Sequence, residues 1–125
     1  MKDLTDRDTF NAATAQEVFD FVAHHLLTQN ERSVSPLGAE CAYRGQNGLK
    51  CAAGCLIPDE IYDEDLEGQL WCNIKDIVDM KQHAYLVTKL QYIHDEKDVN
   101  CWKHELTFLA NRLALSTVVM ELVTR

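Results

Sequence analysis

The five cysteines of the chain are the first residues whose spacing suggests a chemistry. Three residues separate Cys51 from Cys55, and nine separate Cys41 from Cys51. Structural zinc sites favour close pairs of ligands, usually two such pairs, and no second close cysteine pair follows here. Cys101 and His104 lie one turn apart on a predicted helix and could complete four ligands in space. Small apolar neighbours instead favour cysteines packed in the core, so we predict no metal and no cofactor.

A cysteine nucleophile is the second chemistry that these residue types allow. It needs a histidine base within reach and a positive setting that lowers the pKa of the thiol. The chain has five histidines, but its net charge is −8, and negative charge nearby raises the pKa of a thiol. We therefore predict no catalytic residue, and a zinc- or thiol-dependent enzyme is kept only as an alternative.

Acidic residues cluster between residues 59 and 98. Eleven acids and four lysines in this stretch carry −7 of the total charge of −8. Such a run usually marks a solvated face, and it can also oppose a basic groove on a partner. The acids at 59–67 lack the central glycine of a calcium-binding EF-hand loop. Lysine and arginine are scattered singly, which disfavours direct binding to nucleic acid.

A basic and aromatic group, Tyr43, Arg44 and Lys50, surrounds a predicted turn. A guanidinium beside a tyrosine on a glycine-bounded loop can hold a phosphate and stack a base, so this group could bind a nucleotide-like small molecule. The interpretation that we favour is structural. In it, Tyr43 packs on the helices and Arg44 pairs with the acidic residues after Pro58.

The hydrophobic pattern predicts a mainly α fold, a small bundle of four to five helices. Thr14 and Glu17 form a capping box, which predicts that a helix begins there and runs to about Gln29. Further helices are expected over residues 70–78, 86–94 and 102–113, and a short one from about residue 116. Trp71 and Trp102 lie on the apolar stripes of two of these helices, so we expect both in the core.

A short β-hairpin insert is expected near residues 40–52. Asn47 and Gly48 readily take positive φ angles, which is typical of a tight hairpin turn. Residues 51–57 could form a strand or a tightly packed helical turn, since their spacing does not decide between the two. Residues 1–13 are polar and are predicted to be an irregular lead-in.

The whole chain, residues 1–125, is expected to form a single domain. It contains no apolar run of the roughly 18–20 residues that a membrane span requires, so we expect no membrane partner. The N-terminus has no apolar secretory leader, and the number of cysteines is odd, which together favour free thiols in the cytoplasm. A homodimer through one of the apolar-striped helices is compatible with this pattern.

The central part of the chain also carries a signature. It runs Cys41-Ala42-Tyr43-Arg44, then Gly48-Leu49-Lys50-Cys51-Ala52-Ala53-Gly54-Cys55-Leu56-Ile57-Pro58-Asp59-Glu60 with Tyr62 following, and later Leu90-Gln91-Tyr92-Ile93-His94-Asp95. This signature resembles a family of small bacteriophage and prophage proteins, with a likeness over about residues 14–115. The resemblance implies a phage or mobile-element origin, and it assigns no activity and no site residue.

These observations predict a non-enzymatic, phage-type binding protein that inhibits or redirects a host cytoplasmic protein, such as a defence system, by direct contact. The expected binding face comprises Tyr43, Arg44, Lys50, Asp59, Glu60 and Tyr62. The alternative from another class is a small-ligand binder that sequesters a nucleotide-like signal around Arg44 and Lys50.

Overall fold

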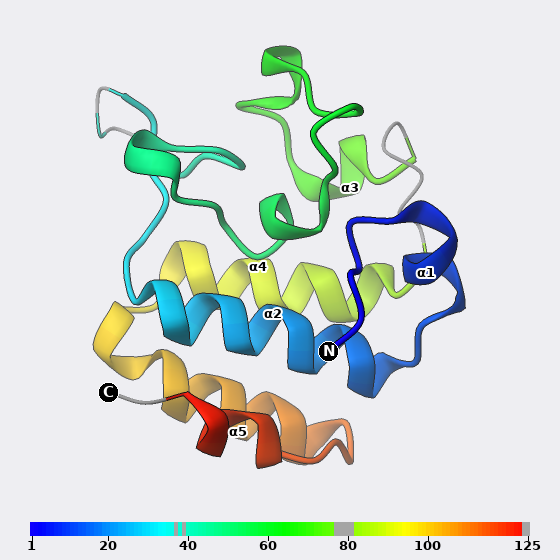
Figure 1. Cartoon of the computed structure of the whole chain (residues 1–125). Coiled ribbons are helices and arrows are strands. Elements are labelled where there is room, and N and C mark those ends of the chain that lie inside the picture. Colours follow the sequence, from blue (N-terminus) through cyan, green and yellow to red (C-terminus); the bar gives the residue numbers. More distant parts are fainter. Residues whose placement is uncertain (37, 39, 77–81, 124–125) are drawn as a thin grey trace.

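Three helices form the bundle of the molecule in the computed structural model, which describes residues 1–36, 38, 40–76 and 82–123 (Figure 1). They are α2 (Ala15–Gln29), α4 (Ala84–Glu96) and α5 (Trp102–Arg112). Helices α4 and α5 both pack against α2 and also contact each other. Their facing side chains, among them Val22, Leu90 and Leu106, are fully buried. The predicted small helical bundle is therefore confirmed.

The capping box at the start of α2 is formed as predicted. The Thr14 hydroxyl oxygen accepts the backbone N–H of Glu17 at 3.1 Å, and the Glu17 carboxylate accepts the backbone N–H of Thr14 at 2.9 Å. The helix ends at Asn30, whose left-handed φ of 54° lets its N–H reach the Leu26 carbonyl oxygen. Two N–H groups that helix geometry leaves unpaired are thus satisfied at one end, and a carbonyl at the other.

The prediction of an irregular lead-in over residues 1–13 is wrong for its second half. Residues Arg7–Ala12 form helix α1. The Asp6 carboxylate caps it by accepting the backbone N–H of Thr9 at 2.9 Å, and Phe10 is fully buried. Only one large apolar side chain of this short helix is buried, so the sequence contains no repeating apolar pattern from which the helix could be predicted.

The remaining helical segments are short. Helix α3 (Trp71–Ile74) is shorter than the predicted helix over 70–78, of which Ile77 and Val78 lie outside the described residues. The predicted last helix is a 3₁₀ helix, Val118–Leu122. Further 3₁₀ turns are Gln46–Gly48, Gly54–Leu56, Glu64–Leu66 and Val99–Cys101. Residues 51–57 therefore adopt the helical-turn alternative.

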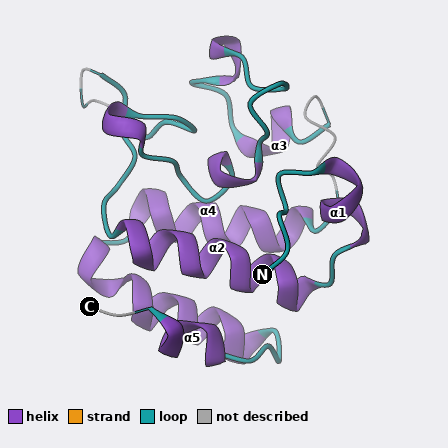
Figure 2. Ribbon diagram, viewed as in Figure 1, coloured by secondary structure: helices purple, strands orange, loops and turns teal. Residues whose placement is uncertain are grey.

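The predicted β-hairpin near residues 40–52 does not form two strands. The described residues contain no β-strand, and Figure 2 shows only helices and loops. Two isolated antiparallel bridges are present, Arg44 with Lys50 and Val34 with Cys41. The turn itself has the predicted backbone, because Asn47 and Gly48 have φ angles of 59° and 76°.

Side chains form hydrogen bonds with the backbone N–H and C=O groups that a longer pair of β-strands would use. The Glu67 carboxylate accepts the N–H groups of Tyr43 and Arg44 at 2.9 and 3.0 Å. The Gln29 side-chain oxygen accepts the N–H of Lys50 at 2.9 Å, and its nitrogen donates to the Lys50 carbonyl at 2.8 Å. Since each backbone group is already satisfied, the pairing stops after one bridge.

A layer of loops, residues 40–70, covers one side of the helical bundle (Figure 1). Its apolar members enter the core, where Cys51, Leu56 and Ile57 are buried. Gly54 allows a close approach within this layer, because a Cβ atom there would lie 2.0 Å from the Tyr43 carbonyl oxygen. The helices therefore support the loop layer from one side (Figure 1).

Candidate functional site

The Glu67 carboxylate organises the loop layer from within. Besides the two backbone N–H groups of Tyr43 and Arg44, it accepts the Tyr62 hydroxyl at 2.6 Å. Burial raises the pKa of Tyr62 above its ordinary value, and the adjacent Glu67 raises it further, so the phenol stays protonated and donates. Glu67 thus joins residues 43–44 to the acidic segment, which we define as residues 59–67.

Arg44 is engaged inside the molecule, as the structural interpretation of the sequence predicted. Its guanidinium lies 2.8 Å from the Asp59 carboxylate and donates to the Ile57 carbonyl at 3.0 Å. It also lies over the Tyr62 ring, 4.3 Å from the ring centre. Tyr43 is buried, as predicted, and its hydroxyl donates to the Gln69 carbonyl at 2.5 Å. These contacts leave little of the Arg44 charge for a phosphate.

Lys50 is the backbone bridge partner of Arg44, and it lines a small cavity of about 360 Å³ together with Asp59 and Glu60. The same cavity is lined by Asp3 and Asp6. Four carboxylates around one lysine give a negative potential, which repels an anionic ligand. The geometry therefore offers no support for a nucleotide-like ligand held between Arg44 and Lys50.

The acidic segment is fixed from inside while most of its acids face outward. Leu66 is buried, and Glu67 is bound as described above. By contrast, Glu60, Asp63, Glu64 and Asp65 are exposed, and none of the four has an ion pair within the part of the chain that the structure describes. The segment therefore presents unpaired negative charge on an anchored backbone.

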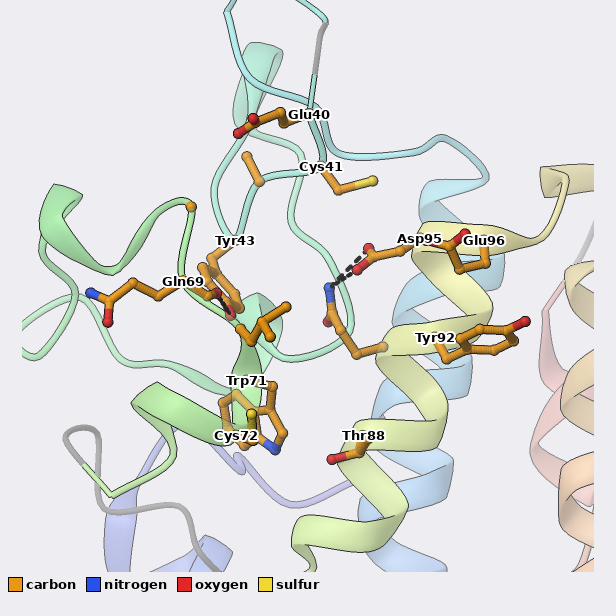
Figure 3. A pocket seen from close by; sticks show the side chains of 14 residues that line it. Glu40, Cys41, Tyr43, Gln69, Trp71, Cys72, Thr88, Tyr92, Asp95 and Glu96 are labelled. Carbon is orange, nitrogen blue, oxygen red and sulfur yellow. Dashed lines mark hydrogen bonds between the residues drawn. The ribbon is translucent and has the colours of Figure 1, made fainter.

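A larger cavity of about 630 Å³ lies between the loop layer and α4 (Figure 3). It is lined by residues 40–43 and 68–72 and by Thr88, Gln91, Tyr92, Asp95 and Glu96. Figure 3 shows Glu40, Cys41 and Asp95 toward one end and Trp71, Cys72 and Thr88 toward the other. The cavity therefore combines a carboxylate-rich end with an aromatic end.

A buried histidine orients one of these carboxylates. His94 is fully buried, and its Nε2 accepts the backbone N–H of Ser33 at 2.9 Å. A backbone N–H can only donate, so Nε2 carries no proton and Nδ1 carries it. Nδ1 then donates to Asp95 Oδ1 at 2.7 Å, and the Gln91 amide donates to the same oxygen at 3.0 Å. His94 is consequently neutral, and it holds Asp95 without cancelling its charge.

Cys41, His94 and Asp95 place three potential metal-ligating atoms within 4.8 Å of one another. A metal bound through Nδ1 of a neutral histidine requires a proton on Nε2, and that proton would face the Ser33 N–H. The present hydrogen bonds therefore oppose a metal at this cluster.

The same cluster is poorly arranged for a thiol nucleophile. A catalytic base must accept the thiol proton, but Nδ1 of His94 already carries a proton and Nε2 is bound to Ser33. Burial raises the pKa of the Cys41 thiol to about 11, and the neighbouring Asp95 charge acts in the same direction. Cys41 is therefore a neutral thiol at the cavity wall.

The other cysteines that suggested zinc do not converge on one point. Cys51 and Cys55 are buried, and burial raises the pKa of both thiols, that of Cys51 to about 12. The Cys51 sulfur accepts the N–H of Gly54, and the Cys55 thiol donates to a backbone carbonyl. These two residues pack as compact core side chains, as the sequence favoured, whereas Cys101 is exposed.

The six residues expected to form one binding face are therefore divided. Arg44 contacts both Asp59 and Tyr62, whereas Tyr43 is buried and lines the larger cavity. Lys50 and Glu60 line the smaller cavity, to which Asp59 also contributes. Sequence reasoning did not identify the structural role of Glu67 or the cavity position of Asp95. Asp95 stood in the quoted signature, but nothing in its spacing indicated a cavity.

Comparison with protein-family models, with curated proteins and with solved structures finds no match for this chain. Within the described residues, no helix has both the length and the apolar character needed to cross a membrane.

Proposed function

We propose that this protein is a non-enzymatic binding protein of phage type that inhibits or redirects a basic host protein by direct contact. The observation that carries the proposal is the acidic segment, in which internal contacts fix the backbone and four carboxylates point outward unpaired. Like charges so close together repel one another, and a basic partner surface would relieve that repulsion.

The geometry of the thiols and of His94 supports a binding role over a thiol-dependent reaction. The raised pKa of Cys41 and the engaged nitrogens of His94 leave this cluster without an activated nucleophile. What the cluster does provide is a fixed carboxylate at a cavity beside the acidic segment. That arrangement suits recognition of positive charge.

The test removes charge from the exposed acids without disturbing the anchored ones. The test variant is Glu60→Gln, Asp63→Asn, Glu64→Gln and Asp65→Asn together. A matched control loses the same number of charges at exposed acids elsewhere, Asp8→Asn, Glu31→Gln, Asp98→Asn and Glu121→Gln. Glu67 is left intact in both variants because it holds the loop layer together.

The measurement is quantitative affinity capture from a bacterial lysate, followed by the affinity of the purified partner for each variant. We expect a stoichiometric basic protein to bind the native chain and the control. The test variant should bind it about tenfold or more weakly, with a smaller salt dependence. Equal binding by all three proteins, or no stoichiometric partner, would overturn the proposal.

A further inference from the structure

We infer that the 630 Å³ cavity between the loop layer and α4 receives an arginine side chain of the partner protein. This inference deepens the proposed function and rests on it. Gly68, Gln69 and Leu70 line the cavity and directly follow the acidic segment. A partner seated on that segment would therefore extend naturally over the cavity mouth.

The charge of the cavity selects a cation. Its lining includes Glu40, Asp95 and Glu96, and no lysine, arginine or histidine is among its lining residues within the described chain. Two cations that contact the C-terminal end of α4 are already engaged. Arg32 donates to the His94 and Lys97 carbonyl oxygens, and the Lys97 ammonium lies over the Tyr92 ring and 3.9 Å from Glu105. An incoming guanidinium would meet carboxylates that lack an internal cation.

Neighbouring side chains hold the Asp95 carboxylate in a fixed orientation. The neutral, fully buried His94 and the Gln91 amide fix the Asp95 carboxylate, and the Gln91 amide oxygen is fixed in turn by the backbone N–H of Ala53 at 2.9 Å. Asp95 Oδ2 accepts from Gln91 at 3.2 Å, and the half-buried Cys41 thiol lies beside the same carboxylate. That oxygen retains capacity to accept an N–H group from a ligand, and its orientation is set before the ligand arrives.

The walls of the cavity suit a planar cation better than a compact one. Tyr43, Trp71 and Tyr92 are all on its lining. Aromatic faces attract cations, and a guanidinium can stack on a ring while its edge donates to a carboxylate. The volume also falls within the range of about 300–1,000 Å³ that is typical of ligand pockets. An arginine side chain therefore matches both ends of the cavity.

A second, independent observation indicates that a polar ligand group is missing from the aromatic end. Trp71 is 4% exposed, and its indole N–H has no hydrogen-bond partner in the described structure. Figure 3 shows the ring nitrogen on the side that faces Thr88. A buried N–H without an acceptor is unfavourable, so a small shift that lets a peptide carbonyl reach it would add to binding. A peptide arginine supplies both a carbonyl and a guanidinium.

The experiment titrates the isotopically labelled full chain with N-acetyl-L-arginine amide and follows backbone and indole N–H signals by NMR. N-acetyl-L-citrulline amide, which has the same shape without the charge, is the matched probe. A ligand of this size is expected to bind with a Kd of order 1 mM. We expect shifts at the Trp71 indole, Asp95 and Glu96, and binding of the citrulline probe about tenfold weaker.

Variants assign the contributions of individual residues. Glu96→Gln and Glu40→Gln should each weaken arginine binding about two- to fivefold, whereas the control Glu121→Gln should leave it unchanged. Trp71→Phe, which keeps an aromatic ring but removes the N–H together with the five-membered ring, should also weaken binding several-fold. Unchanged binding by Trp71→Phe would overturn the role of that N–H.

Equal affinity for the two probes, or no shift at about 20 mM probe, would overturn the arginine site.

Failure of the arginine site can be distinguished from failure of the proposed function. The four-acid test variant keeps every lining residue of the cavity, so it should bind the arginine probe normally while losing the partner. A partner that still binds the native chain after the probe has failed would leave the proposed function in place and remove only the arginine site.

Discussion

At the scale of single residues, the five thiol groups show how burial and neighbouring charge determine the reactivity of a side chain. The same side chain is buried at Cys51 and Cys55, half-buried beside a carboxylate at Cys41, and exposed at Cys72 and Cys101. Only the thiolate reacts, so both access and pKa determine reactivity. The two exposed thiols are reachable but have no assembled histidine base in the described structure.

Alkylation with iodoacetamide should reproduce this order. At pH 8 a thiol with a pKa of about 11 is about one part in a thousand thiolate, against about one in ten for an ordinary thiol with a pKa of 9.0. We expect the half-buried Cys41 to react much more slowly than the exposed Cys72 and to speed up as the pH approaches 11, and Cys51 and Cys55 to react only after unfolding.

Peptide mapping by mass spectrometry over time measures these rates, and the unfolded protein, in which all five thiols should react, is the control. Alkylation of Cys41 as fast as Cys72 at pH 8 would contradict the assignment of Cys41 as a neutral wall residue. It would reopen the thiol-enzyme alternative.

The sequence predicted the role of a single residue correctly where that role depends on the residue's own type and on its near neighbours in the chain. The small neighbours of Cys51 and Cys55 indicated core packing, and the acids after Pro58 indicated a partner for Arg44. It failed for Glu67, whose role depends on the N–H groups of residues more than twenty positions earlier. No local pattern records such a contact.

At the scale of elements, the acidic segment depends on one internal carboxylate. Replacing Glu67 with glutamine removes the charge and directs an amide NH₂ toward groups that are themselves donors. Because hydrogen bonds to charged groups contribute about 1.5–3 kcal/mol, we expect Glu67→Gln to lower the free energy of unfolding by about 2–3 kcal/mol. The raised pKa of Tyr62 should also fall toward its ordinary value, since Glu67 contributes to raising it.

Urea unfolding and spectrophotometric titration of the tyrosines measure the two effects. The matched control is Glu64→Gln, an exposed acid of the same segment, which should change stability by less than about 0.5 kcal/mol. Equal stability of the two variants would show that Glu67 does not anchor the segment.

The long helices could be predicted and the loop layer could not, for a physical reason. Helices α2, α4 and α5 repeat apolar residues at a local period, and α2 carries its own cap. The hairpin prediction found the correct turn at Asn47 and Gly48 but not the competing side-chain hydrogen bonds from Gln29 and Glu67. Those acceptors come from distant segments, and they end the strand pairing after one bridge.

At the scale of the whole molecule, the helical bundle acts as a support for one specialised side. The loop layer places the acidic segment next to a cavity with carboxylates at one end and the Trp71 ring at the other. Both features favour positive charge, so they would act on the same partner. The 3₁₀ helix Val118–Leu122 packs against α2 and is not part of the lining of that cavity, which makes it a natural reference surface.

Hydrogen–deuterium exchange of the complex with the captured basic partner tests the proposed binding surface most directly. We predict slower exchange in residues 40–44 and 59–72 when the partner is bound, with residues 116–122 unchanged. Protection confined to residues 116–122, with 59–72 exchanging as in the free protein, would contradict the account, because the partner would then bind away from the acidic segment and its cavity.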